Sequence, residues 1–103
     1  MIVLQVNVKM ISQIPIKIEK IERKILDREI LRVAIIAELD AVNLYEQLAA
    51  ATDNETIRRV LLEVAREEKT HVGEFQALLL EEDAEQTKEL EKGRKEVEEI
   101  TER

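Results

Sequence analysis

Helix-breaking residues are almost absent from most of this sequence. Pro15 is the only proline, and the two glycines, Gly73 and Gly93, stand alone in long stretches of Ala, Leu, Ile, Glu, Lys and Arg. Residues of these types favour helices, whereas proline and glycine disfavour them. Apolar residues recur at helical spacing in three segments, about 27–51, 55–81 and 84–101. The sequence therefore predicts an all-α fold.

Two capping signals separate the three predicted helices. Thr52-Asp-Asn-Glu55 has the form of a capping box, which marks the start of a helix. Asp83-Ala-Glu-Gln86 has the same spacing and predicts the start of the next helix. Because the first two helices are long and the turn between them is short, we expect an antiparallel helical hairpin over residues 27–81. The third helix, within 82–103, has only a thin apolar stripe, so we expect it to dock weakly or to serve as an arm.

The first 26 residues are expected to form an N-terminal arm. Apolar residues alternate with polar ones from Ile2 to Met10, which is a strand pattern. Further along, Ile14, Ile18 and Ile21 also lie at helical spacing, so a short helix after Gln13 remains an alternative. An extended arm has no sheet partner within this chain and is expected to pair with, or fold over, another subunit. Its role stays open.

Composition excludes several classes of function. The formal net charge of -7 argues against binding to nucleic acid, and the absence of cysteine excludes thiolate metal sites and disulfides. No apolar run approaches the roughly 20 residues that a membrane-spanning helix needs. We therefore expect a cytoplasmic protein that contacts neither nucleic acid nor membrane.

Three polar residues break the apolar faces of the first two helices. Glu38 lies at the centre of the first apolar stripe, and Glu68 and His71 lie within the second. An unpaired buried carboxylate is costly, so these residues need a compensating cation. Glu68-Lys-Thr-His71 is a Glu-x-x-His pair, and di-iron carboxylate bundles use two such pairs and two further glutamates. Most other acidic residues, including Asp40 and Asp83, are expected at the surface.

The ligand count predicts a homodimer. One chain supplies one glutamate and one Glu-x-x-His pair, which is half of a di-iron set. Two copies would form a four-helix bundle whose four carboxylates balance two Fe(II) ions. Iron, manganese and zinc all suit such ligands, and two metals with mostly oxygen donors favour iron. The first helix has more apolar surface than a simple dimer buries, which favours a larger assembly.

Each of these residues also has a reading without a metal. Glu38 and His71 could form a buried acid–imidazole contact, and a single histidine in an apolar face is often a core residue. Tyr45 lies one heptad after Glu38 on the same face. It could pack in the core with its hydroxyl at the rim, or donate a hydrogen bond near the metals.

The stretch from Ile30 to about Leu80 resembles the encapsulated ferritins, which are rubrerythrin-like members of the ferritin-like superfamily. The resemblance is carried by residues 34–47, with Glu38 and Tyr45, and by residues 64–75, with Glu68 and His71. It implies metals at a dimer interface and a ring-shaped decamer inside an encapsulin shell. It also implies ferroxidase activity, the oxidation of Fe(II) to Fe(III) with dioxygen, with Glu38, Glu68 and His71 as ligands, Tyr45 nearby, and iron stored in the shell.

Two other functions compete with ferroxidation. One is rubrerythrin-like peroxide scavenging at a di-iron site, which in a chain without cysteine would need an outside reductant. The other is a non-catalytic helical oligomer whose site holds a structural metal or none. The native metal, the oligomer size and the route into a shell are left open by the residues.

Overall fold

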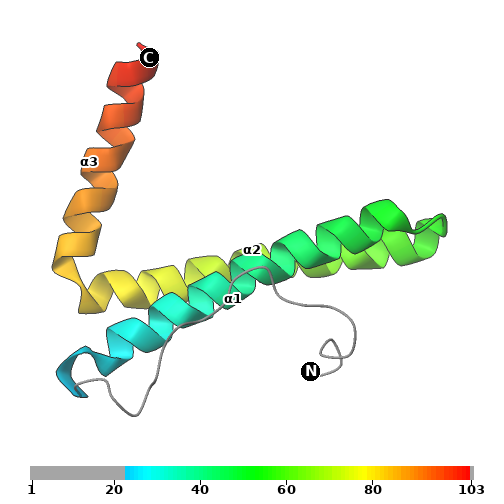
Figure 1. Ribbon diagram of the computed structural model, residues 1–103, viewed down its shortest axis with the longest axis horizontal. Coiled ribbons are helices and arrows are strands. Elements are labelled where there is room, and N and C mark those ends of the chain that lie inside the picture. Colours follow the sequence, from blue (N-terminus) through cyan, green and yellow to red (C-terminus); the bar gives the residue numbers. More distant parts are fainter. Residues whose placement is uncertain (1–22, 103) are drawn as a thin grey trace.

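The computed structural model describes residues 23–102, which form three helices and contain no strand (Figure 1). These are α1 (Arg23–Ala51), α2 (Glu55–Glu82) and α3 (Ala84–Thr101). The all-α prediction is confirmed. Helix α1 begins four residues before the expected start at Asp27, and the rest of the expected N-terminal arm lies outside the described residues. None of the described helices is both long and apolar enough to span a bilayer.

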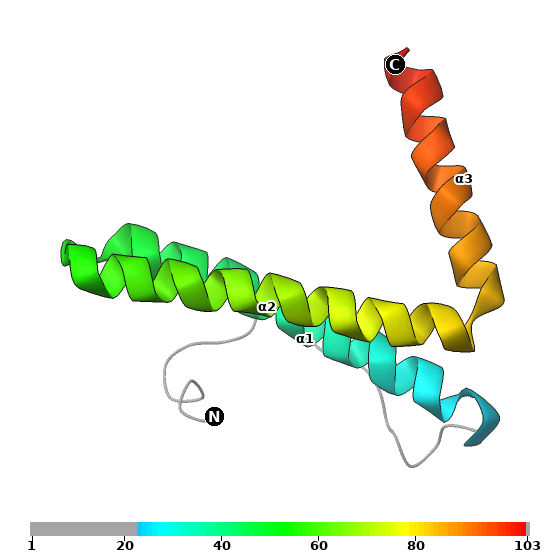
Figure 2. The ribbon, with the colours of Figure 1, turned by 180° about the vertical axis from the view of Figure 1, so that it is seen from behind.

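Helices α1 and α2 run antiparallel, side by side, and are joined by residues 52–54 (Figures 1 and 2). The residue that caps α2 is Asn54, whose side-chain oxygen accepts a 3.0 Å hydrogen bond from the Ile57 N–H. Thr52 instead accepts a bond from the Asn54 N–H, and Glu55 pairs with Arg58. The predicted capping box at Thr52 is therefore wrong. Asn54 stands directly before the helix, and asparagine is at least as good a cap as threonine.

A side chain from α2 closes the end of α1. Arg58 donates to the Ala49 carbonyl oxygen at 3.1 Å and also to the carbonyl oxygen of Thr52. The last carbonyls of a helix have no partner within the helix, so they need outside donors. Arg58 supplies two such bonds and thereby ties the turn to both helices.

The hairpin alone covers only part of its apolar surface. Within residues 23–102, the buried apolar side chains are Val42, Ala49, Ala65 and Leu79, where α1 faces α2. Ile57, Val60 and Leu78 of α2 remain about half exposed or more, as do Ile30 and Leu39 of α1. Exposed apolar side chains in such number are typical of an interaction surface.

Helix α3 leaves the hairpin at a steep angle (Figures 1 and 2). Asp83 caps it by accepting a 3.1 Å hydrogen bond from the Gln86 N–H, and it also pairs with Arg32 of α1 at 2.8 Å. Asp83 and Asp40 are both buried, so their expected place at the surface is wrong. For Asp83 the reason is that a single carboxylate serves the cap and the ion pair together.

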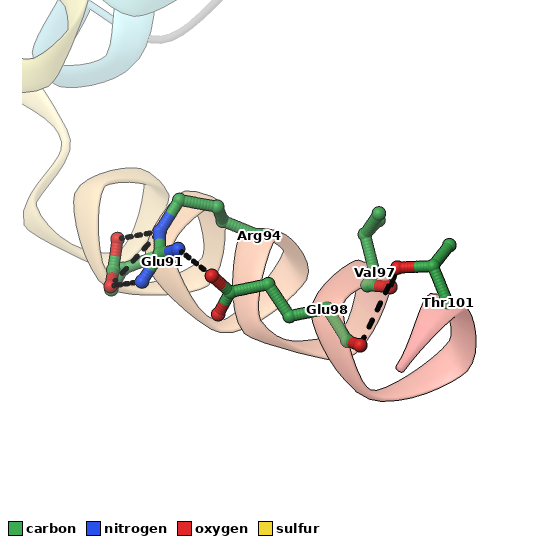
Figure 3. Close-up of polar contacts among 5 residues, drawn as sticks. All are labelled: Glu91, Arg94, Val97, Glu98 and Thr101. Carbon is green, nitrogen blue, oxygen red and sulfur yellow. Dashed lines mark hydrogen bonds and ion pairs between the residues drawn. The ribbon is translucent and has the colours of Figure 1, made fainter. Parts of the chain in front are cut away.

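The stability of α3 rests on local interactions. Arg94 bridges Glu91 and Glu98 along one side, and the Thr101 hydroxyl donates to the Val97 carbonyl oxygen at 2.8 Å (Figure 3). No residue of α3 is buried, and Leu90, Val97 and Ile100 are exposed. Ion pairs at this helical spacing each contribute only a few tenths of a kcal/mol. The described part of the chain therefore shows α3 as an arm, as the thin stripe predicted.

Candidate metal centre

A cluster of three polar side chains lies on a partly exposed face of the hairpin and consists of Glu38, Glu68 and His71. Glu38 projects from the middle of α1, while Glu68 and His71 project from α2 at i, i+3 spacing, which places them on one face. One ligand atom from each residue lies within 4.8 Å of the others. Two antiparallel helices thus gather residues that are up to 33 positions apart in the sequence.

The imidazole of His71 lies between the two carboxylates. Its Nδ1 atom is 3.4 Å from Glu38 Oε2 and 3.2 Å from Glu68 Oε2. The two glutamate side chains are each 19% exposed, whereas the histidine side chain is 44% exposed. The carboxylates are therefore shielded by the hairpin, and the site opens to the outside on the histidine side.

Proximity shifts the pKa values of two members of the group. Burial, followed by the hydrogen bond with Glu68 and its charge, raises the pKa of Glu38, and His71 opposes this shift. The hydrogen bond with Glu68 is the largest factor that raises the pKa of His71, and Glu38 adds to it while desolvation opposes it. Without a metal, Glu38 and His71 thus hold their protons more tightly than they would apart.

The donor set suits a divalent transition metal. Two carboxylate oxygens and one imidazole nitrogen are the ligand types that iron, manganese and zinc accept. Ligands of this kind must be deprotonated to bind, so a metal would compete with protons for Glu38 and His71. Three ligands also leave coordination positions free, toward the open side of the hairpin.

Tyr45 is not part of this cluster. Its side chain is half-buried in α1, and it makes no hydrogen bond with the described residues. Its role near a metal stays a prediction. An ion pair that was not predicted, between Lys69 and Glu46 at 3.3 Å, does join α2 to α1 one position from each of Glu68 and Tyr45.

Comparisons with known proteins identify the family of the chain and its fold. The rubrerythrin family profile matches residues 29–102. The crystal structure of an encapsulated ferritin domain from Pyrococcus furiosus superposes with a TM-score of 0.77 at 55% identity, covering 90% of this chain and 95% of that one.

Two curated relatives are similar in sequence. The chain is 64% identical over 73 residues to a ferritin-like–encapsulin shell fusion protein of Pyrococcus furiosus, a match that covers 71% of this chain and 21% of the relative. It is 42% identical over 69 residues to the encapsulin nanocompartment cargo protein EncC of Myxococcus xanthus, over 64% of this chain and 53% of the relative. The chain thus spans about a fifth and about half of their lengths.

The family profile covers most of α1 and all of α2 and α3, and its range includes Glu38, Glu68 and His71. The structural match extends over nearly the whole of the encapsulated ferritin domain, so the fold is ferritin-like. The chain belongs to the rubrerythrin family, as a relative of its encapsulated ferritins.

Proposed function

We propose that the protein is a ferroxidase, which oxidises Fe(II) to Fe(III) with dioxygen at a di-iron site shared by two copies of the chain. The observation that carries the proposal is the cluster of Glu38, Glu68 and His71, whose ligand atoms lie within 4.8 Å of one another on an open face. One such cluster holds half the ligands of a di-iron carboxylate site. A second copy on the same face supplies the other half.

Charge supports the two-copy arrangement. Two copies bring four carboxylates together, and two Fe(II) ions balance them. The same face of the hairpin exposes Val60 and Leu78, which a second copy would remove from water. Shared burial and shared ligands thus favour one interface.

Each ligand has a distinct task in this proposal. Glu38 would hold a metal from α1, and Glu68 would hold it from α2. His71, the most exposed of the three, would add an imidazole nitrogen from the exposed side of the cluster. Bound iron supplies the redox chemistry, and dioxygen accepts the electrons. The hairpin keeps the carboxylates shielded from bulk water.

The relatives support a role in iron storage within an encapsulin shell. One is a fusion with a shell protein, and the other is a cargo protein of an encapsulin nanocompartment. We propose that the protein acts inside such a shell in the cytoplasm, as part of an assembly larger than a dimer. A decamer is the size that the resemblance to encapsulated ferritins implies.

Iron oxidation kinetics test the proposal. Fe(II) is added to the metal-free protein under air, and ferric absorbance is followed for wild type, Glu68→Gln and the control Glu89→Gln on exposed α3. We expect rapid oxidation with wild type and the control, and a rate near the protein-free background with Glu68→Gln. Equal rates in all three proteins would contradict ferroxidation at this site.

Membership of the rubrerythrin family favours peroxide scavenging as the second candidate. Peroxide consumption that needs an added reductant, without fast oxidation of Fe(II) by air, would support it. Metal binding with neither activity would support the third candidate, a non-catalytic metal-binding oligomer.

A further inference from the structure

We propose that the ion pair between Arg32 and Asp83 is a latch that fixes the direction in which α3 leaves the hairpin, and that α3 swings about Asp83 when the pair is broken. The latch joins α1 to the start of α3 and involves none of the residues of the metal cluster. The inference goes beyond the proposed function and does not depend on it.

A single residue, Asp83, forms the junction between α2 and α3. Helix α2 ends at Glu82 and α3 begins at Ala84, and the backbone of Asp83 is not helical, with φ -139° and ψ 87°. Rotation about these two dihedral angles changes the angle between the helices. One non-helical residue leaves that angle undetermined, so other contacts must set it.

Burial of α3 is confined to its first turn. Gln86 is half-buried, whereas every residue from 87 to 101 is exposed. Along the apolar stripe of α3, the exposed fraction rises from 44% at Leu90 to 81% at Ile100. The ribbon views agree, because α3 projects away from α1 and α2 along its length (Figures 1 and 2). The direction of α3 is therefore set at its start.

The carboxylate of Asp83 is bonded on both sides of the junction. Its Oδ1 atom accepts a 3.1 Å hydrogen bond from the Gln86 N–H in α3, and its Oδ2 atom accepts a 2.8 Å bond from Arg32 Nη2 in α1. The side chain of Asp83 is only 9% exposed, so water and salt screen this pair less than pairs between two exposed side chains. One rigid carboxylate thus ties the first turn of α3 to α1 and holds the angle.

Two further groups act at the junction. Arg28, one turn before Arg32 on α1, places a second positive charge near Asp83, so it is a replacement partner for the carboxylate when Arg32 is removed. The Thr87 hydroxyl of α3 donates to the Leu80 carbonyl oxygen of α2 at 3.3 Å. This second bond is long for a hydroxyl donor and exposed, so we expect it to restrain α3 less than the latch does.

Distances between α2 and α3 test the latch. The natural chain has no cysteine, so spin labels can be attached at Glu74→Cys in α2 and Glu96→Cys in α3, which are both exposed positions. Glu96 lies about 20 Å along α3 from Asp83, so a rotation of about 30° at the junction would move it by roughly 10 Å. Pulsed electron paramagnetic resonance measures the distance distribution in the metal-free full chain, diluted until light scattering shows single chains.

Two variants break the latch in different ways. Arg28→Ala/Arg32→Ala removes the donors, whereas Asp83→Asn keeps one oxygen for the cap and replaces the other with an amide that cannot accept. We expect a narrow distribution for wild type and a width at least about twofold larger for both variants, because the dihedral angles of Asp83 are then free to change. The control Arg66→Ala, which breaks an exposed ion pair within α2, should match wild type.

The outcomes decide the inference without reference to iron. A distribution as narrow as that of wild type in either latch variant overturns it. So does a larger broadening by Thr87→Val than by the double arginine variant, because the main restraint would then be the bond to the Leu80 carbonyl oxygen. Circular dichroism verifies that every labelled variant retains its helices. Since the protein is metal-free throughout, a failed latch leaves the ferroxidase proposal intact, and slow iron oxidation leaves the latch intact.

Discussion

Arg32 of α1 donates a 2.8 Å hydrogen bond to Oδ2 of Asp83, and this ion pair joins positions 51 residues apart. The aspartate is buried and caps α3 at the same time. The pair therefore connects the start of α3 to the first half of α1. It is the one ion pair in residues 23–102 that links α1 to the junction between α2 and α3.

The charge of Asp83 should make stability depend on pH. The hydrogen bond from the Gln86 N–H, followed by Arg32 and the charges of Arg28 and Arg32, lowers the pKa of Asp83. A lowered pKa stabilises the fold above the ordinary aspartate pKa of about 3.9, and this stabilisation is lost as the pH falls through the lower value of the folded state. Asp83→Asn keeps a capping oxygen but removes the charge. The variant should therefore melt below wild type at pH 6, and the difference should shrink below pH 4.

The cap on α2 should contribute measurably to stability. Asn54→Ala removes the acceptor for the Ile57 N–H. Loss of such a cap costs about 1 kcal/mol. Chemical denaturation followed by circular dichroism measures the change, and Asp53→Ala, in the same exposed turn, is the matched control. An equal effect of both substitutions would show that the cap is not the cause.

Arg58 should matter more than other arginines of α2. Its guanidinium donates to two carbonyl oxygens at the end of α1 and to Glu55, whereas exposed Arg66 pairs only with Glu63. Hydrogen bonds from a charged donor contribute about 1.5–3 kcal/mol, and an exposed ion pair contributes about 0–1 kcal/mol. We expect Arg58→Ala to lower the free energy of unfolding by about 2 kcal/mol and Arg66→Ala by less than about 1 kcal/mol. A denaturant series on both variants measures the difference.

Metal should favour assembly through the carboxylates of the cluster. In the proposed shared site without metal, Glu38 and Glu68 from two copies would crowd one interface. A ligand that binds only the assembled form shifts the equilibrium toward that form. Light scattering should show a larger mass for wild type with Fe(II) under anaerobic conditions than with a chelator. Glu38→Gln relieves repulsion, so its metal-free form should assemble at least as well as metal-free wild type yet gain little from Fe(II). A wild-type mass that is independent of metal would show that packing alone drives assembly.

Alanine should replace either glycine without a clash inside a single chain. A Cβ atom at Gly93 meets no atom within 4 Å, and the same holds at Gly73 in α2. Alanine is more favourable than glycine inside a helix by about 0.5–1 kcal/mol. Gly93→Ala and Gly73→Ala should therefore each raise the unfolding midpoint of the monomer. A variant that gains monomer stability but loses mass in light scattering would place its glycine against another subunit.

Sequence periodicity was sufficient to predict the hairpin and the cluster. Glu38, Glu68 and His71 stood out because they interrupt apolar faces, and the structure does bring them together. A polar residue at the centre of an apolar stripe has few alternatives, so helical angles alone identify it.

The sequence did not predict the roles of residues whose surroundings are set by contacts between helices. Asp83 has the local form of a helix cap, and its burial against Arg32 becomes visible only when α1 returns beside the α2–α3 junction. The choice of Asn54 over Thr52 as a cap depended on where α2 begins, and helix ends are uncertain by one or two residues in any pattern. Tyr45 shares the face of Glu38, but a shared face does not determine where a hydroxyl finds a partner.

The three-residue turn between α1 and α2 gives the hairpin little freedom to slide. A shift of one helical turn would move Glu38 about 5.4 Å along α2 and out of reach of His71, which is now 3.4 Å away. Metal affinity thus measures the alignment of the two helices. An insertion in the turn that leaves helix content unchanged but abolishes metal binding would reveal a misaligned hairpin that circular dichroism alone could not detect.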